Sequence, residues 1–310
     1  MELSIVSTMY RSEPYLAEFV RRVGQAAESL TRDYEIVLVN DGSPDRSREL
    51  ALALQRDDPR IVVVDLSRNF GHHKAIMTGL AHAQGDRVFL IDSDLEEEPE
   101  LLVEFWNELA QHPALDVVYG VQRRRKGGLF ERLSGYLYFT VANWLSDVKI
   151  PRNFLTVRLM TRRYVESLVR FEERDFVFSA LTELAGYEGA PIVVTKLDKG
   201  GSTYSLLMKF RVLVNHITST SVRPLWIVFQ IGLVITLLTG VLIVRLLYVY
   251  FTRNITPGFT SLALSIWFLG GMQLMAIGVV GVYLAKVYTQ VKGRPYTIVR
   301  QVYRARTADS

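Results

Sequence analysis

Two carboxylates separated by one residue follow a short apolar run, Val88 to Ile91. They are Asp92 and Asp94. Two carboxylates at this spacing can share a divalent cation, and Mg²⁺ and Mn²⁺ prefer oxygen ligands that include substrate phosphates. The pair therefore predicts a Mg²⁺ or Mn²⁺ site for a substrate with a diphosphate, whose departure the cation would aid by neutralising charge. The alternative is that these carboxylates only cap a helix beginning near Pro99.

Two other polar segments follow apolar runs. The turn at positions 40–43 can place the carboxylate of Asp41 and backbone amides around a base or ribose. The alternative is an ordinary Asp-Gly turn, with a nearby side chain such as Asp45 capping a helix. The second segment contains His72 and His73. Because adjacent helix side chains do not converge well on one metal, we interpret these histidines as a polar helix start rather than a zinc site.

The elements that position these residues follow from the apolar pattern. Helical patterns separate short β-branched runs, and the first helix carries its apolar residues at three- and four-residue steps. Near-continuous apolar strands alternating with helices predict a parallel α/β sheet covered on both faces, with ligands at the carboxyl ends of the strands. The expected strands are Leu3–Val6, Ile36–Val39, Ile61–Val64, Val88–Ile91 and Val117–Tyr119. The apolar residues of the first helix are Leu16, Phe19, Val20, Val23, Ala27 and Leu30.

Two long apolar runs, Pro224–Val244 and Phe259–Ala285, follow this polar region and contain no Asp, Glu, Lys or Arg. Each exceeds the roughly 20 residues that cross a bilayer as a helix, so we expect a hairpin of two transmembrane helices. Buried core helices are the alternative. Lys and Arg are frequent beside the outer ends of the runs, whereas the connecting segment has only Arg245 and Arg253. The positive-inside rule then places both termini in the cytoplasm.

Composition narrows the function further. The chain has 310 residues, no cysteine and a formal net charge of +4. The absence of cysteine excludes structural disulfides and Cys-ligated zinc. The N-terminus passes directly into a strand pattern, so we expect no cleavable signal peptide. Nucleic acid is not an expected partner because the basic residues flank the apolar runs, a placement that favours anionic membrane lipid.

Taken in order along the chain, these motifs have a family resemblance. The chain resembles the polyprenyl-phosphate glycosyltransferases, specifically the bactoprenol subgroup, which are relatives of dolichol-phosphate mannose synthase within the inverting family-2 glycosyltransferases. The resemblance implies an A-type glycosyltransferase fold, Rossmann-like, followed by the transmembrane hairpin. The motifs that carry it are Val39–Ser43, Leu66–Gly71, Asp92–Leu95 with Pro99–Glu100, Ile150–Pro151, Arg158–Met160, Gly201–Tyr204, Val287–Tyr288 and Arg294–Tyr296, with the Met9, Tyr10 and Glu13 region.

The resemblance implies that a sugar moves from a nucleotide-sugar donor, usually UDP-linked, to undecaprenyl phosphate, with inversion at the anomeric carbon. Asp92 and Asp94 match the diphosphate and metal positions, and Asp94 is the preferred metal ligand. Asp41 would hold the nucleobase. The loop that lines the nucleotide would contribute Thr8, Tyr10 and Glu13.

Acceptor binding is assigned by the same resemblance to the arginines Arg123, Arg125 and Arg132. A cationic pocket near the membrane suits a phosphate, and the alternative for each arginine is a solvated basic face. Thr156 stands where close relatives often carry Asp, which removes a catalytic base from that position. Two other functions remain open: a catalytically inactive membrane scaffold, and a processive polysaccharide synthase, for which two membrane spans are too few.

The expected organisation has four parts. Residues 1–204 form the cytoplasmic glycosyltransferase domain, 205–223 an amphipathic juxtamembrane segment, 224–285 the hairpin and 286–310 a cytoplasmic tail. The resemblance implies a multi-pass protein of the bacterial inner membrane that serves cell-envelope glycans such as lipopolysaccharide. The sequence leaves open the sugar, the choice between the two metals and whether the chain forms a homo-oligomer.

Overall fold

The computed structural model describes residues 1–122, 140, 144–145, 154–174, 176–195, 214, 217–218, 221–252 and 258–305. The chain divides into two compact units. The first contains residues 1–139, 149–205 and 294–310, and the second contains residues 140–148 and 206–293. Each unit is described by itself.

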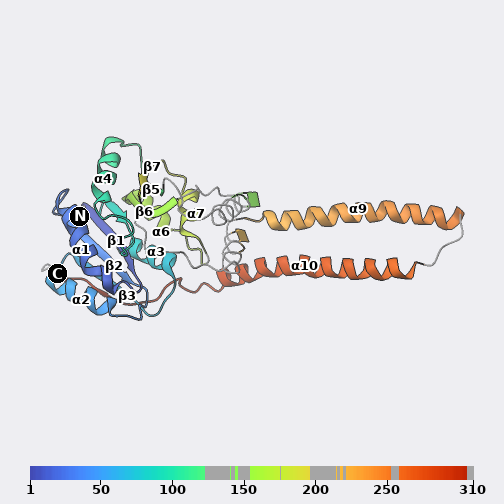
Figure 1. Ribbon diagram of the computed structural model, residues 1–310, viewed down its shortest axis with the longest axis horizontal. Helices are drawn as coiled ribbons and strands as arrows, with labels where there is room; N and C mark the ends of the chain where they lie inside the picture. The colour runs from blue at the N-terminus through green and yellow to red at the C-terminus, as the bar shows by residue number, and fades with distance from the viewer. Residues whose placement is uncertain are drawn as a thin grey trace. The chain divides into compact units, whose positions relative to one another are not determined.

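A mixed sheet forms the centre of the first unit (Figure 1). Its strand order is β7-β5-β6-β4-β1-β2-β3-β8. Strands β1 to β4 are parallel, as their pairings show. Strand β6 is antiparallel to both β4 and β5, and β8 is antiparallel to β3. The strands are β1 (Leu3–Met9), β2 (Tyr34–Asn40), β3 (Ile61–Leu66), β4 (Arg87–Leu90), β5 (Val117–Gln122), β6 (Phe154–Thr161), β7 (Gly189–Val194) and β8 (Val299–Tyr303).

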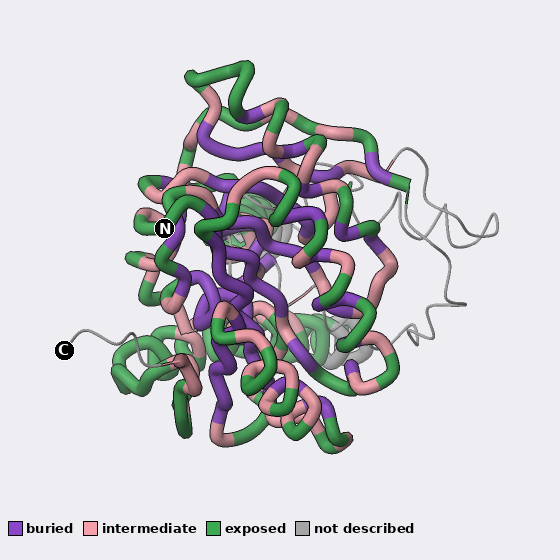
Figure 2. Tube along the Cα trace, turned by 90° about the vertical axis from the view of Figure 1, so that its left-hand side faces the viewer, coloured by how far each residue is buried: buried purple, intermediate pink, exposed green. Residues whose placement is uncertain are grey.

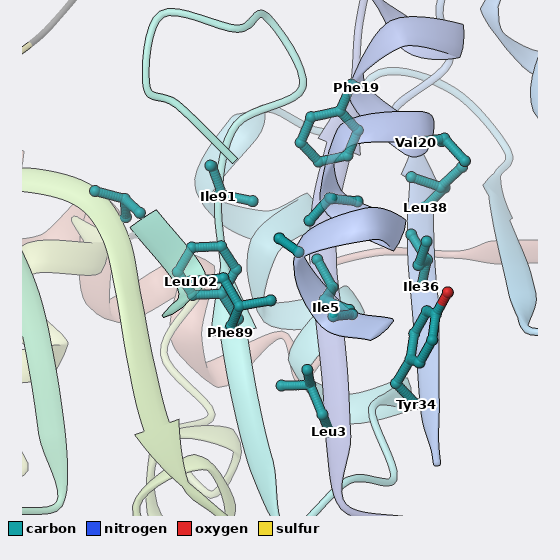
Figure 3. Close-up of a cluster of buried hydrophobic side chains, with 14 of the residues drawn as sticks. Leu3, Ile5, Phe19, Val20, Tyr34, Ile36, Leu38, Phe89, Ile91 and Leu102 are labelled. Carbon is teal, nitrogen blue, oxygen red and sulfur yellow. The ribbon is translucent and has the colours of Figure 1, made fainter. Parts of the chain in front are cut away.

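Helices cover both faces of this sheet because its central strands present apolar side chains in both directions. One buried cluster joins alternate strand residues to α1 and α4, and Phe19 and Val20 of α1 point into it (Figure 3). The other cluster joins the opposite strand residues to α3, α6 and α7. The buried residues concentrate along the central strands (Figure 2). The helices are α1 (Glu13–Glu28), α2 (Ser47–Asp57), α3 (His72–His82), α4 (Leu101–Gln111), α6 (Arg162–Val169) and α7 (Phe178–Leu184).

The A-type α/β fold expected from the sequence is confirmed, and so are all five expected strands and the first helix. The expectation of a parallel sheet holds for β1 to β4 but was incomplete, because β6 and β8 are antiparallel. The sequence analysis did not identify β6, β7 or β8. A charged residue, Arg158, interrupts the apolar pattern of the β6 sequence, and a glycine and a proline lie in β7. Strand β8 has two consecutive polar residues, Arg300 and Gln301, and lies at a sheet edge, and the sequence predicted its residues only as part of a tail.

The second unit contains two long helices, α9 (Arg223–Thr252) and α10 (Phe259–Val291), which lie side by side (Figure 1). The segments Arg223–Leu242 and Ser265–Val291 are long and apolar enough to cross a membrane, and neither is buried within the protein. Large exposed side chains along them include Trp226, Val241 and Leu274. Tyr283 of α10 donates a hydrogen bond of 2.7 Å to the carbonyl oxygen of Ser221, which precedes α9.

Candidate active site

The carboxyl ends of β1, β2, β3 and β4 form one edge of the sheet, and the polar segments found in the sequence lie there. Helix α1 packs on one face and α3 on the other. The chain therefore changes direction across the sheet at β1, whose neighbours are β2 and β4. Such a switch point is where open α/β sheets bind ligands.

A short chain of contacts joins the end of β1 to the end of β4 through α3. Thr8 Oγ1 lies 3.1 Å from His72 Nδ1, and His72 Nε2 lies 3.5 Å from Asp92 Oδ1. Between the two carboxylates, Ser93 Oγ donates a hydrogen bond of 2.8 Å to the carbonyl oxygen of Thr8 and lies 2.9 Å from Ser12 Oγ. The structure thus brings Thr8 and Asp92 together, whereas their predicted roles in binding stay predictions. It adds His72 between them.

Asp94 holds the tight turn that follows it and does not cap a helix. Its Oδ1 accepts a hydrogen bond of 2.9 Å from the backbone amide of Glu96. Helix α4 begins only at Leu101, so the capping alternative for the carboxylate pair does not apply. Leu95 has φ of 59° and Arg11 has φ of 57°, and among the described residues these are the two non-glycine residues with positive φ. Such conformations cost energy and cluster at binding sites, and both of these lie at the predicted edge.

Asp41 is almost fully buried and holds the loop that follows β3. Its Oδ1 accepts from the amide of Phe70 at 2.7 Å, and its Oδ2 accepts from the amide of Gly71 at 3.0 Å. Burial raises the pKa of Asp41, and the two amide hydrogen bonds lower it in part. The nucleobase-binding role of Asp41 stays a prediction. The observed contacts give it a second role, which is to fix the start of α3 beside His72.

Glu13, one of the residues predicted to line the nucleotide, belongs to a hydrogen-bond network around Asp45. The amide of Glu13 donates to Asp45 at 3.2 Å, and the hydroxyls of Ser43 and Ser47 each donate to Asp45 Oδ1 at 2.6 Å. Although burial raises the pKa of Asp45, these hydrogen bonds outweigh burial and lower it to about 2. The turn given above as the alternative, with Asp45 at the start of α2, is therefore present, and the nucleotide-binding role of positions 40–43 stays a prediction.

Glu13 already has a partner within the protein, whereas the ring of Tyr10 is accessible to a ligand. The carboxylate of Glu13 forms an ion pair of 2.6 Å with Arg46, so this acid already has a cationic partner. Tyr10 is 47% exposed. A ring this accessible at the edge of the sheet can stack on a base, and the nucleotide-lining role of Tyr10 stays a prediction.

Gly42 is required where the turn after β2 meets the loop after β3. Its φ is +60°, and an added Cβ would lie 2.4 Å from the backbone nitrogen of Asn69. We expect Gly42→Ala to lower the free energy of unfolding by ~2–4 kcal/mol, because left-handed backbone strain adds to a clash with backbone. Denaturation of the full chain in detergent measures this. Gly186→Ala is the matched control, since Gly186 has φ of +69° but its nearest atom would be 3.9 Å away. Equal losses in the two variants would contradict the close approach.

A divalent cation fits this edge only with help from a substrate. Among the residues that the structure describes, no three His, Asp or Glu side chains are grouped to hold a metal. The chemistry of Asp92 and Asp94 nevertheless suits Mg²⁺ or Mn²⁺, which bind one or two carboxylates and take their other ligands from phosphates and water. The predicted site therefore fits a metal that enters with a nucleoside diphosphate.

Strand β6 brings Thr156 to the same edge. Leu90 and Arg158 are the last paired residues of β4 and β6 at this end, and Asp92 and Thr156 each lie two positions further along the two antiparallel segments. Arg158 is fully buried between the rings of Phe154 and Phe178, at 4.6 and 4.7 Å from their centroids. Burial lowers its pKa to about 10. The Thr156 carbonyl accepts from Arg158 Nε at 3.0 Å, so backbone atoms anchor this position.

The predicted acceptor-binding arginines Arg123, Arg125 and Arg132 lie outside the described residues. So does most of the amphipathic juxtamembrane segment expected at 205–223. Sequence reasoning missed His72, which it interpreted only as a helix start, and Ser93, the residue between the two carboxylates. The signal for both was their position directly beside predicted strand ends. Their contacts with Thr8 depend on strand order, which the sequence did not give.

Comparison with known proteins shows the family of this chain. The sequence family described as Glycosyl transferase family 2 matches residues 4–169. A Mycobacterium tuberculosis protein named as a glycosyltransferase is 46% identical over 98% of this chain and 89% of its own. The SfII prophage-derived bactoprenol glucosyl transferase of Shigella flexneri is 32% identical, with 98% and 99% covered. The chain therefore belongs to glycosyl transferase family 2, and the predicted glycosyltransferase activity is confirmed.

The motif-based resemblance to polyprenyl-phosphate glycosyltransferases is also confirmed, since several similar proteins are named bactoprenol glucosyl transferase and match over nearly their whole length. A solved structure shares the fold. It is glucosyl-3-phosphoglycerate synthase from Mycobacterium tuberculosis in complex with Mn²⁺, UDP-glucose and phosphoglyceric acid. This structure is 17% identical, covers 70% of this chain and 79% of its own, and has a TM-score of 0.50.

Proposed function

We propose that this protein transfers a sugar from a nucleotide-sugar, with UDP as the expected carrier, to undecaprenyl phosphate at the cytoplasmic face of a bacterial membrane. The observation that supports this most is the likeness to the Shigella bactoprenol glucosyl transferase, which extends over 98% of this chain and therefore includes both apolar helices. Two such helices would hold the enzyme at the bilayer, where a lipid-linked acceptor is located. A polyprenyl chain would remain in the bilayer while its phosphate reaches the enzyme.

The proposed reaction is a single displacement. A phosphate oxygen of the acceptor attacks the anomeric carbon from the face opposite the diphosphate, a new C–O bond forms, and the bond to the nucleoside diphosphate breaks with its electron pair leaving on that diphosphate. One displacement inverts the anomeric centre. When bound, a divalent cation supplies positive charge to the leaving diphosphate. Asp94 and Asp92 would hold that cation, and the half-exposed ring of Tyr10 would stack on the base.

The contacts among the site residues support binding of the nucleotide-sugar at this edge of the sheet. The turn at positions 40–43 and the loop at 67–71 are tied together through Asp41, and His72 is tied to Asp92. A nucleotide lying across this edge would reach the base side at β2 and the diphosphate side at β4. We assign acceptor-phosphate binding to Arg123, Arg125 and Arg132, because guanidinium groups bind phosphate oxygens through paired hydrogen bonds.

A transfer assay tests this proposal directly. Purified protein in detergent is incubated with undecaprenyl phosphate and a panel of radiolabelled nucleotide sugars, and lipid-soluble label is counted. We expect one donor to give a labelled lipid that retains a single phosphate and the inverted anomeric configuration. Absence of labelled lipid with every donor, from protein that is folded, would overturn the proposed acceptor.

Both termini and the enzyme domain are proposed to lie in the cytoplasm. Strand β8 follows α10 in the chain and pairs with β3, which precedes α9. Segments that share one sheet must lie on one side of a membrane, so this pairing supports two crossings rather than one. The scarcity of Lys and Arg between the helices supports the orientation.

Cysteine labelling checks this topology, and the chain has no native cysteine to interfere. We expect a cysteine at Thr256 or Thr260 to react with an impermeant thiol reagent applied to intact cells, and a cysteine at Ser310 to react only after the cells are opened. The expected difference is nearly complete because the reagent does not cross the bilayer. Labelling of the Ser310 position alone in intact cells would reverse the orientation.

A further inference from the structure

The segment that follows α10 returns to the sheet of the first unit and contacts the loop after β3. Thr297 Oγ1 lies 2.8 Å from Thr78 Oγ1 of α3, and the carbonyl oxygen of Ile298 accepts from the amide of Ser67 at 2.9 Å. Strand β8 then pairs with the edge of β3. Nothing in the proposed transfer reaction requires this return. Its position suggests a role at the edge formed by the carboxyl ends of β1 to β4, where the nucleotide-sugar donor is proposed to bind and which we call the donor edge.

Arg300 occupies an irregular position in β8. Asp65 pairs with Gln301 and Leu66 pairs with Val299, so Arg300 is the extra residue of a β-bulge. Bulges redirect a side chain and are frequent beside active sites. Here the guanidinium reaches two groups of β3 and its following loop: Nη1 lies 3.3 Å from Asp65 Oδ2, and Nη2 donates to the carbonyl oxygen of Ser67 at 2.8 Å.

Asp65 connects this guanidinium to the turn after β2. Its side chain is fully buried, and it accepts from Arg48 Nε at 3.0 Å and from Asn40 Nδ2 at 2.8 Å. The side-chain oxygen of Asn40 in turn accepts from the amide of Ser43 at 3.1 Å. Arg300 therefore contacts the chain of polar groups that sets the turn at positions 40–43. Arg48 Nη2 also donates to the hydroxyl of Tyr303 in β8 at 3.1 Å, which adds a second link to the same strand.

The contact of Arg300 with Ser67 reaches the second segment of the donor edge, the loop after β3. Ser67 begins the loop whose Phe70 and Gly71 amides bind Asp41. One guanidinium thus holds the start of this loop and, through Asp65, the turn that carries Asp41. A flat, two-pronged donor can bridge a carboxylate and a carbonyl in a way that a single ammonium cannot.

We propose that Arg300 is a positioning residue that sets the nucleotide-binding edge from the C-terminal strand. This rests on the proposed function in that the ligand is a nucleoside diphosphate. Arg300 need not touch the nucleotide. It orients the turn at positions 40–43 and the loop at 67–71, and these two segments would contact the nucleotide.

The chain offers a matched control in Arg304, which follows β8 in the same tail. Arg304 forms an ion pair of 3.0 Å with the buried Glu35 and donates to the side chain of Gln84 at 2.6 Å. Glu35 is near the start of β2, and Gln84 precedes β4. Arg304 therefore resembles Arg300 in residue type and in having a buried acidic partner, but it acts at the amino ends of the strands, away from the donor edge.

Two measurements on the full chain in detergent test the proposal. The first is hydrogen exchange of the backbone, which needs no ligand. In Arg300→Ala we expect segments 40–43 and 67–71 to exchange about fivefold faster or more, the change that follows from losing one hydrogen bond. In Arg304→Ala we expect these segments to be unchanged and exchange to rise near Gln84 instead.

The second measurement is calorimetric titration with UDP in the presence of Mg²⁺. We expect about fivefold weaker binding by Arg300→Ala and wild-type binding by Arg304→Ala. Arg300→Lys should recover only part of the loss because one ammonium cannot bridge both acceptors. Full recovery by lysine would overturn the two-pronged role.

The two measurements distinguish a failure of the positioning role of Arg300 from a failure of the proposed nucleotide donor. Unchanged exchange at 40–43 and 67–71 in Arg300→Ala would overturn the positioning role, and so would faster exchange with unaltered UDP affinity. If wild-type protein binds no UDP, the proposed donor is wrong, and the exchange comparison alone still supports or overturns the claim that Arg300 orders this edge.

Discussion

Asp94→Asn should remove most sugar transfer, with a fall in turnover of roughly 10²–10³-fold, because the cation that it holds is worth several kcal/mol to the departing diphosphate. The fold should survive. An asparagine oxygen can still accept the hydrogen bond that Asp94 Oδ1 takes from the amide of Glu96, so the turn after β4 keeps its anchor. The measurement is the rate at which label moves from the nucleotide sugar to the lipid.

A control for this variant lies in the same acidic run. Glu98→Gln makes the same change of charge at an exposed position of that run, and we expect wild-type turnover from it. Excess EDTA should act on the wild type as Asp94→Asn does. Near-normal turnover in Asp94→Asn, or full wild-type activity in EDTA, would show that a cation at this carboxylate does not assist the reaction.

An acceptor without its phosphate should be inert, and this is the second large effect that we expect. An alcohol nucleophile needs a general base, whereas a phosphate monoester with a second pKa of about 6 is already largely anionic at neutral pH. Free polyprenol should therefore give no product. With the phosphorylated acceptor, the rate should rise with pH and level off above roughly pH 7 as that ionisation is completed.

The same reasoning separates Thr156 from the acceptor arginines. Thr156→Ala should keep activity within about tenfold of wild type, because no proton has to be removed by that side chain. The contact between its carbonyl oxygen and Arg158 involves only backbone on the threonine side, so alanine preserves it. Arg132→Ala should be more damaging through loss of phosphate binding. Efficient transfer to free polyprenol, or loss of activity in a folded Thr156→Ala protein, would contradict a phosphate nucleophile.

Local patterns in the sequence determined much of this protein. The β-branched runs specified β1 to β5, because strands buried on both faces need apolar residues at nearly every position. The apolar spacing specified α1, and two charge-free runs specified α9 and α10. Since the polar residues Asp41, Asp92 and Asp94 directly follow such strands, their place at the carboxyl edge also followed from the sequence. Short-range periodicity was sufficient for each of these features.

Strand order and strand direction were decided only by the tertiary structure. No local pattern shows that β6 enters between β4 and β5, or that β8 pairs with β3 across more than 200 residues of chain, since both depend on contacts between distant segments. The same dependence hid the contact of His72 with Thr8 and Asp92. It also hid Arg300, which looks in the sequence like one more basic residue of a tail. Only the bulge in β8 and the buried carboxylate of Asp65 show what this arginine holds, because a side chain's partner is set by the fold around it.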